Sequence, residues 1–173
     1  MRRIIITTFA LVLTTVSLQA QRFAYVDMQY ILENLPEYQE AQTQLDNIAE
    51  GWRAEVSTKM DEVDQMYRQF QAEQVLLTEP MKRQRIEAIE QKEREVKEYQ
   101  KSKFGPEGEL FERRQQLIKP IQDRVYDAIQ ELAREKGYDV IFDKSGEVMM
   151  LFTNDRYDKS ADILDKLTAS PAD

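Results

Sequence analysis

The sequence predicts a mostly helical α+β protein in which a long antiparallel helical hairpin projects from a small, β-rich oligomerisation body. Residues 37–119 are highly charged, and up to Phe104 they contain one proline, Pro80, and one glycine, Gly51. Apolar residues recur there every three or four positions, which is typical of long helices with one narrow apolar face. Short apolar segments precede and follow this stretch, and they are expected to form the body.

The first twenty residues have the features of a secretory signal peptide. Arg2 and Arg3 form a positive start, and residues 4–16 are apolar except for threonines. Ala20 then offers a small residue at a cleavage point before Gln21. The apolar run is too short to span a membrane comfortably, so we expect no stable membrane anchor. The chain has no cysteine, which excludes a lipid-anchored lipoprotein.

The composition limits the classes of function. Residues 21–173 contain 22 basic and 32 acidic residues, a net charge of −10. This balance argues against nucleic-acid binding, which depends on lysine and arginine meeting phosphates. The sequence contains neither histidine nor cysteine. Catalytic Ser-His-Asp and Cys-His arrangements are therefore absent, and so are metal sites built from histidine or cysteine. We expect no catalytic residues, no metal and no cofactor.

The chain is expected to begin with a strand and a short helix. Residues 23–26 favour β structure. Asp27 can cap a helix over residues 28–33. Leu35 and Pro36 then mark a boundary, because the residue before a proline avoids helical angles and proline suits the first turn of a helix.

A first long helix is predicted over residues 37–77. At ~1.5 Å per residue it would be about 60 Å long. Its apolar residues form a heptad pattern with one four-residue stutter near Trp52. Gly51, beside the stutter, costs about 1 kcal/mol relative to alanine without necessarily breaking the helix. The stripe consists of Tyr38, Ala41, Leu45, Ile48, Trp52, Val56, Met60, Val63, Tyr67 and Phe70.

The tip of the hairpin is predicted near residues 76–81. Thr78 is a good cap and Pro80 fits the first turn of a new helix. Leu76 and Leu77 would then be exposed apolar residues at the turn. The second helix carries its apolar stripe at Met81, Ile86, Ile89, Val96, Tyr99 and Phe104.

The two long helices differ in charge. Residues 37–77 contain 3 basic and 9 acidic residues, whereas residues 78–104 contain 8 basic and 6 acidic residues. An antiparallel hairpin would set these unlike charges side by side and so favour one register. The alternative is two solvated faces whose composition differs by chance.

Residues 105–108, Gly-Pro-Glu-Gly, are expected to interrupt or kink the return helix, and we predict flexibility there. Pro120 is expected to kink the helix that follows. Gly137 is a plausible C-terminal cap. The apolar seam of this helix consists of Leu117, Ile118, Ile121, Val125, Ala128 and Leu132.

The C-terminal part predicts a β-hairpin and one more helix. Residues 138–143 and 148–152 are the expected strands, with a turn at residues 144–146. Asp158 can cap the last helix. Residues after Thr168 are expected to be disordered. The inner face of the last helix would consist of Ile163, Leu164 and Leu167.

These elements predict a homo-oligomer. Three short strands and two short helices cannot close a sheet or bury a sizeable core alone. Strands from several chains joining in one closed sheet would remove the exposed edges. Residues 21–36 and 121–173 would form this shared body and residues 37–120 the hairpin; the alternative is a monomer with a two-helix stalk. The expected body residues are Phe23, Tyr25, Val26, Val140, Ile141, Phe142, Val148, Met150 and Phe152.

The chain resembles the Skp/OmpH family of periplasmic chaperones. The segments that carry this resemblance follow the exported start in order and cover most of the chain: residues 23–27, 31–32, 35–36, 117–122, 128–133, 136–141 and 158–164.

The resemblance implies a jellyfish-shaped homotrimer with a β-barrel body and three helical tentacles around a cavity. It implies an ATP-independent periplasmic holdase that binds unfolded outer-membrane proteins and has no catalytic residues. The chain departs from the often basic members of the family by its acidic charge, which puts simple steering of acidic clients in doubt. A lipopolysaccharide contact has no support beyond one basic cluster, Lys82, Arg83 and Arg85.

Client contacts are expected at adaptable or exposed apolar residues of the hairpin. Methionine adapts to irregular partners, which suits promiscuous binding. For each such residue the alternative is packing within the apolar stripe of the hairpin. The candidates are Met60, Met66, Leu76, Leu77 and Met81.

Two other classes of function compete with the chaperone. A structural coiled-coil adaptor joining cell-envelope proteins would need one fixed partner and a saturable interface. An enzyme could use the carboxylates of Asp61, Glu62 and Asp64 for acid–base work in a desolvated cleft. Those residues lie in a charge-rich helix, where a solvated face is the favoured interpretation.

Overall fold

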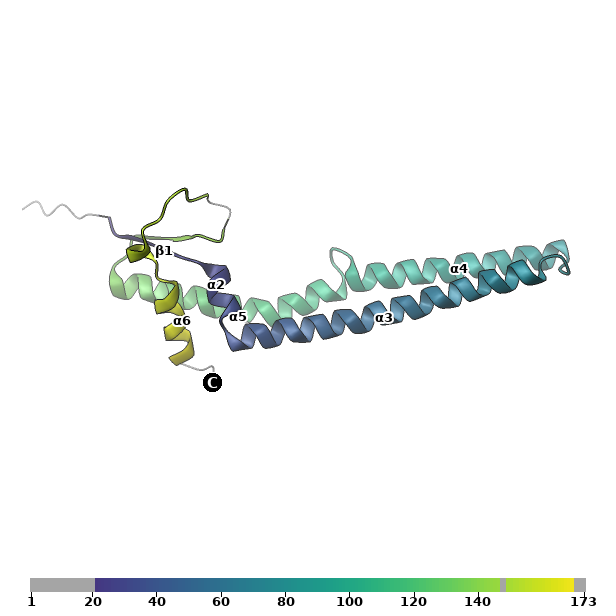
Figure 1. The fold of residues 1–173 in the computed structure, drawn as a ribbon, viewed down its shortest axis with the longest axis horizontal. Helices are drawn as coiled ribbons and strands as arrows, with labels where there is room; N and C mark the ends of the chain where they lie inside the picture. The colour runs from purple at the N-terminus through teal and green to yellow at the C-terminus, as the bar shows by residue number, and fades with distance from the viewer. Residues whose placement is uncertain (1–20, 147–148, 170–173) are drawn as a thin grey trace, which may run out of the picture.

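The computed structural model describes residues 21–146 and 149–169. A long hairpin of two helices, α3 and α4, projects from a body that holds β1, α2, α6 and part of α5 (Figure 1). The predicted signal peptide lies outside the described residues. Among the helices described, none has both the length and the apolarity needed to cross a membrane.

Two short strands join distant parts of the chain. Strand β1 (Phe23–Val26) pairs in parallel with β2 (Val140–Asp143), with Phe23 opposite Val140 and Val26 opposite Asp143. Tyr25 also forms an isolated parallel bridge with Asp158. Strand β1 therefore has β2 on one side and the segment before the last helix on the other.

Helix α2 (Met28–Glu33) follows β1 at the predicted position. The Asp27 carboxylate accepts a hydrogen bond from the backbone N–H of Tyr30 at 2.9 Å, which confirms the predicted cap. Leu35 is buried, and Pro36 opens the next helix. The chain thus turns from the body into the hairpin within two residues.

Helices α3 (Pro36–Glu73) and α4 (Glu79–Phe104) form the hairpin (Figure 1). The 38 residues of α3 span about 57 Å at ~1.5 Å per residue. Thr78 is the N-cap of α4 in extended conformation, although its side chain makes no capping hydrogen bond, and Pro80 lies in the first turn. The turn between the two helices therefore lies at residues 74–78, and α3 ends four residues earlier than expected.

Helix α5 (Glu109–Lys136) begins after the interruption at residues 105–108 and continues through Pro120. It ends at Gly137, whose φ of 66° is left-handed, so glycine is the residue that suits this cap. Helix α3 packs along α5 near the body and along α4 farther out. The continuous helix α3 therefore packs against two shorter helices, α4 and α5.

The last elements are a short 3₁₀ helix, η2 (Asp155–Tyr157), and helix α6 (Ser160–Ala169). The Asp158 carboxylate accepts a hydrogen bond from the backbone N–H of Ser160 at 2.9 Å, as a cap should. The Ser160 hydroxyl in turn accepts from the backbone N–H of Asp27 at 2.8 Å. This buried serine ties the start of α6 to the end of β1.

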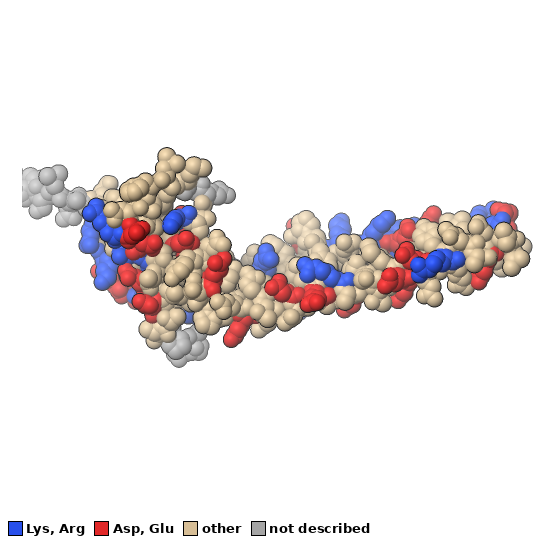
Figure 2. All heavy atoms as spheres, in the orientation of Figure 1, with Lys and Arg blue, Asp and Glu red and all other residues tan. Residues whose placement is uncertain are grey.

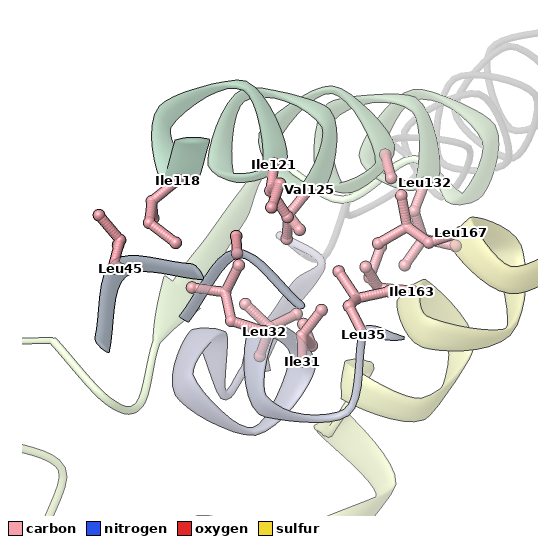
Figure 3. Packing of buried hydrophobic residues seen from close by; sticks show 13 residues of the cluster. Ile31, Leu32, Leu35, Leu45, Ile118, Ile121, Val125, Leu132, Ile163 and Leu167 are labelled. Atoms are coloured by element: carbon pink, nitrogen blue, oxygen red, sulfur yellow. The ribbon is translucent and has the colours of Figure 1, made fainter. Parts of the chain in front are cut away.

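Two apolar clusters hold the fold. The proximal core joins α2, α3, α5 and α6 beside β1, and Figure 3 shows its side chains converging between α5 and the short helices. The distal core lies within the hairpin and consists of Val56, Val63, Ile89 and Val96. The proximal core consists of Val26, Ile31, Leu32, Leu35, Ala41, Leu45, Ile118, Ile121, Val125, Ala128, Leu132, Ile163 and Leu167.

The predicted C-terminal β-hairpin is wrong. Residues 138–143 do contain a strand, but it pairs with β1, and residues 149–152 form no strand. Val148 lies outside the described residues. Residues 149–152 are all apolar, so a strand there would place apolar side chains on both of its faces and would need to be covered on two sides. The described sheet of one chain has only two strands and cannot supply this cover.

Candidate functional site

The hairpin tip is the most exposed apolar part of the distal hairpin. Val75 and Leu76 are each 84% exposed between the end of α3 and the start of α4. Leu77 is half-buried, and Met81, in the first turn of α4, is 48% exposed. The backbone N–H of Leu76 donates to the carbonyl of Glu73 at 2.9 Å, so the turn has a defined conformation. The tip therefore presents apolar side chains on a hydrogen-bonded turn.

The two methionines proposed within α3 lie in different surroundings. Met60 is 50% exposed, whereas Met66 is half-buried and packs against the distal core. Met66 thus takes part in packing within the hairpin, the alternative considered for each candidate. The exposed members of the predicted set are Met60, Leu76 and Met81.

Two exposed apolar residues were assigned to the packed stripe by the sequence pattern. Tyr67 is 40% exposed and Ile86 is 42% exposed. The Tyr67 hydroxyl donates to the Glu93 carboxylate of α4 at 3.0 Å, which raises the pKa of Tyr67. Tyr67 follows Met60 by one heptad, and this spacing is the signal that places both at one edge of the stripe.

Charged side chains cross the hairpin from basic α4 to acidic α3. Lys92 pairs with Glu62 at 2.8 Å and Arg85 with Glu73 at 3.9 Å. The hydrogen bond from Lys92 lowers the pKa of Glu62, and the same bond raises the pKa of Lys92. In both pairs the acidic residue lies on α3 and the basic residue on α4, as expected from the charge difference between the two helices. Figure 2 shows positive and negative side chains interspersed along the hairpin.

The carboxylates considered for an enzyme are not gathered in a cleft. Asp61, Glu62 and Asp64 are all exposed on α3. Within the described residues, no group of three or more acidic side chains is placed to hold a metal ion. This cluster is a solvated face, as the sequence favoured. In the basic cluster of the tip, Lys82 pairs with Glu79 at 2.8 Å.

The body has a second apolar surface. Phe23, Val140 and Phe142 are between 42% and 48% exposed, and Leu151 and Phe152 are 92% and 85% exposed. The rings of Phe23 and Tyr157 stack with centroids 4.7 Å apart. A hollow of about 380 Å³ opens here, lined by Phe23, Ala24, Tyr25, Phe142, Met150, Phe152, Thr153, Asn154 and Tyr157. We call these exposed and lining residues the body face.

The remaining expected body residues within the described part of the chain are buried or half-buried. Val26 belongs to the proximal core, and Ile141 packs against it. Tyr25 is buried and borders the hollow, and Met150 is half-buried. Tyr157 was missed by the sequence analysis, because its place opposite Phe23 depends on a contact between distant segments.

Comparison with protein families gives a match to a family described as outer membrane protein (OmpH-like), over residues 22–167. A crystal structure described as an outer membrane chaperone (OmpH-like) from Caulobacter crescentus CB15 has a similar fold, with a TM-score of 0.70. The two chains are 13% identical, and the match covers 86% of this chain and 85% of the other. The search of curated proteins gives no match.

Proposed function

Because the chain belongs to the OmpH-like family of outer membrane proteins, we propose that it is an ATP-independent periplasmic holdase chaperone. Its clients would be unfolded outer-membrane β-barrel proteins, which it would bind in a cavity between helical hairpins and protect from aggregation. The description of the similar structure from Caulobacter crescentus as an outer membrane chaperone supports this proposal.

The observation that carries the proposal is the exposed apolar tip on an otherwise charged hairpin. Val75 and Leu76 are each 84% exposed, and Met60 and Met81 add half-exposed flexible side chains. Unfolded barrel strands show alternating apolar residues, and burying one such side chain contributes about 1.5–3 kcal/mol. Several such contacts, none of fixed geometry, would hold many different clients.

We propose that three chains assemble through the body face. In one chain, Phe142, Leu151 and Phe152 leave a large apolar surface exposed, and the sheet has two strands within the described residues. Strands or loops of neighbouring chains would cover this surface, as obligate interfaces do. Native mass determination tests it: a trimer is expected, and a monomer at micromolar concentration would contradict the cavity mechanism.

The holding activity can be tested with a refolding β-barrel protein. We expect an equimolar amount of the trimer to suppress light scattering as denaturant is diluted. Replacing Val75 and Leu76 together by serine should weaken this suppression several-fold, because it removes the exposed apolar side chains. The matched control is Gln74→Ser, which changes an exposed polar residue of the same turn.

Absence of suppression by the unaltered protein would reject the holdase. Independently of that assay, capture of interacting proteins from a cell envelope separates the chaperone from the adaptor. Many outer-membrane proteins support the chaperone, whereas one stoichiometric partner supports the adaptor.

Export to the periplasm is part of the proposal. The expected signal peptide would be removed near Ala20, so the periplasmic protein should begin at Gln21. N-terminal sequencing of the protein from a periplasmic extract checks this. A start at Met1 would contradict it.

A further inference from the structure

A cluster of aromatic and charged side chains occupies the middle of the hairpin, where α3, α4 and α5 meet. We propose that this cluster closes a mechanical joint, with Lys103 as its central side chain, and that the joint sets the angle of the distal hairpin relative to α5. We call it the Lys103 joint. It concerns the mechanics of the hairpin and does not depend on the holdase proposal.

The two sides of the hairpin, α3 and the pair α4–α5, each contain a point where the helix is weakened, and these two points lie opposite each other. The side formed by α4 and α5 is interrupted at residues 105–108, directly after α4. Opposite it, α3 contains Gly51, which is exposed, and a Cβ placed there would meet no atom within 4 Å beyond its chain neighbours and the nearby backbone of its own helix. A glycine in a helix interior costs about 1 kcal/mol relative to alanine, and no contact explains this one. The edge-to-face pair of Trp52 and Phe104, with centroids 6.2 Å apart, shows that the two weak points are neighbours.

The interruption itself is tightly built. A Cβ on Gly105 would lie 2.5 Å from the carbonyl oxygen of Lys101. A Cβ on Gly108 would lie 2.9 Å from the carbonyl oxygens of Ser102 and Lys103. The backbone N–H of Gly108 donates to the carbonyl of Gly105 at 2.9 Å. The loop therefore has one defined closed form, in which it packs against the last turn of α4.

Lys103 links all three helices in this closed form. Its ammonium nitrogen lies 4.9 Å from the centroid of the Trp52 ring on α3 and 5.3 Å from that of Tyr99 on α4. It also donates to the carboxylate of Glu109, in the first turn of α5. The Lys103 side chain is only 15% exposed, which is low for a lysine. Partial removal from water strengthens each of these attractions.

A second layer of contacts surrounds Lys103. The Lys59 ammonium lies 5.0 Å from the Tyr99 centroid, and the Arg53 guanidinium carbon lies 5.9 Å from the Phe104 centroid. The Tyr99 hydroxyl donates to the Glu55 carboxylate on α3. These contacts hold α4 to α3, whereas Lys103 alone among them reaches α5.

The arrangement suits a joint that opens and closes. Each cation–aromatic contact is weak, so their sum can be broken without unfolding the helices. With the Lys103 contacts broken, the loop at 105–108 and the glycine in α3 are the two points where the two sides of the hairpin can bend. The distal core lies beyond the joint and would move as one piece.

The test uses Lys103→Met, which keeps the aliphatic chain and removes the charge. We expect amides 99–110 to exchange hydrogen about tenfold faster, because two cation–aromatic contacts and one ion pair are lost. Trp52 is the only tryptophan of the chain, so its fluorescence spectrum should change as well. Lys97→Met is the matched control, because Lys97 is exposed on α4 and makes no ion pair within the described residues.

A distance measurement tests the angle. The chain has no cysteine, so Gln71→Cys on α3 and Gln122→Cys on α5, both exposed, can carry two spin labels. Labelled chains are diluted with unlabelled ones before assembly, so that distances are measured within one chain. Lys103→Met should broaden the distance distribution, while Lys97→Met leaves it unchanged.

Four outcomes would overturn the joint. The first is an unchanged distance distribution in Lys103→Met. The second is faster exchange spread evenly over α3 and α4, which would mean general destabilisation. The third is an equal effect of Lys97→Met. Circular dichroism should show the same helix content for both variants, and a loss of helix in Lys103→Met would also reject the proposal.

Discussion

The proximal and distal cores are built differently. The proximal core collects side chains from five elements, β1, α2, α3, α5 and α6, and Ile163 and Val125 are fully buried within it (Figure 3). The distal core has four buried residues from two helices. A packed globular interior thus continues into a narrow two-helix seam, and the two parts should respond differently to the same change.

The difference teaches where each region obtains its stability. In the proximal core, a removed side chain leaves a cavity whose walls come from several elements and cannot all move inward. In the distal seam, neighbouring exposed side chains and water can occupy the space. A matched pair of isoleucines, Ile163 and Ile89, makes this comparison direct, because they are 0% and 2% exposed.

The largest effect is expected for Ile163→Ala. It should lower the free energy of unfolding by about 4 kcal/mol, because a full cavity remains. Thermal unfolding at one fixed protein concentration checks this, since assembly links stability to concentration. A loss below about 2 kcal/mol would mean that the proximal core can collapse as the distal seam does.

Ile89→Ala should cost less, about 2 kcal/mol, and act locally. Hydrogen exchange should become faster at distal amides of α3 and α4, while the amides of α2 and α6 keep their protection. Equal losses of stability for the two isoleucines, or faster exchange in the body, would remove the distinction between the cores.

Two glycine substitutions should have opposite signs. Gly51→Ala fills open space and should stabilise α3 by up to about 1 kcal/mol. Gly108→Ala forces a Cβ against the backbone of α4 and should destabilise by about 1–3 kcal/mol. Chemical denaturation of both variants checks the signs. A stabilising Gly108→Ala would show that the loop is not packed as described.

The smallest effect concerns alkaline pH and the middle of the hairpin. The hydrogen bond to the Glu55 carboxylate, followed by burial, raises the pKa of Tyr99 from 10.0 to about 12. The neutral phenol is favoured in the folded chain, so this contribution is complete below pH 10 and is lost as the pH rises through 12. Tyrosinate absorbance against pH should lose a group that titrates at about pH 12 when Tyr99 is replaced by phenylalanine. Unchanged titration in Tyr99→Phe would contradict the assignment.

Most helix boundaries could be predicted because their signals are local. Asp27, Pro36, Pro80 and Gly137 each act on the turn in which they lie, so their effect is visible in a few neighbouring residues. The spacing of apolar residues every three or four positions likewise predicted the two helices of the hairpin. These signals need no knowledge of what the helices pack against.

The pairing of the strands and the exposure of each methionine could not be predicted from such local signals. Residues 140–143 pair with β1, more than a hundred residues earlier, and nothing local selects this parallel pairing over a tight hairpin. The predicted stripe contains Met60 and not Met66, yet Met60 is 50% exposed and Met66 packs against the distal core. Lys103 was overlooked because a lysine in a charged helix is ordinarily solvated.

The parallel pairing of β1 with β2 returns the chain to its starting place after the hairpin. The reach of the hairpin is therefore free to vary without any change in the body. Seven residues added to each of α3 and α4, beyond the Lys103 joint, would move the tip outward by about 10 Å and preserve the heptad phase. Selection or engineering could in this way adjust the size of the proposed client cavity while the sheet stays constant.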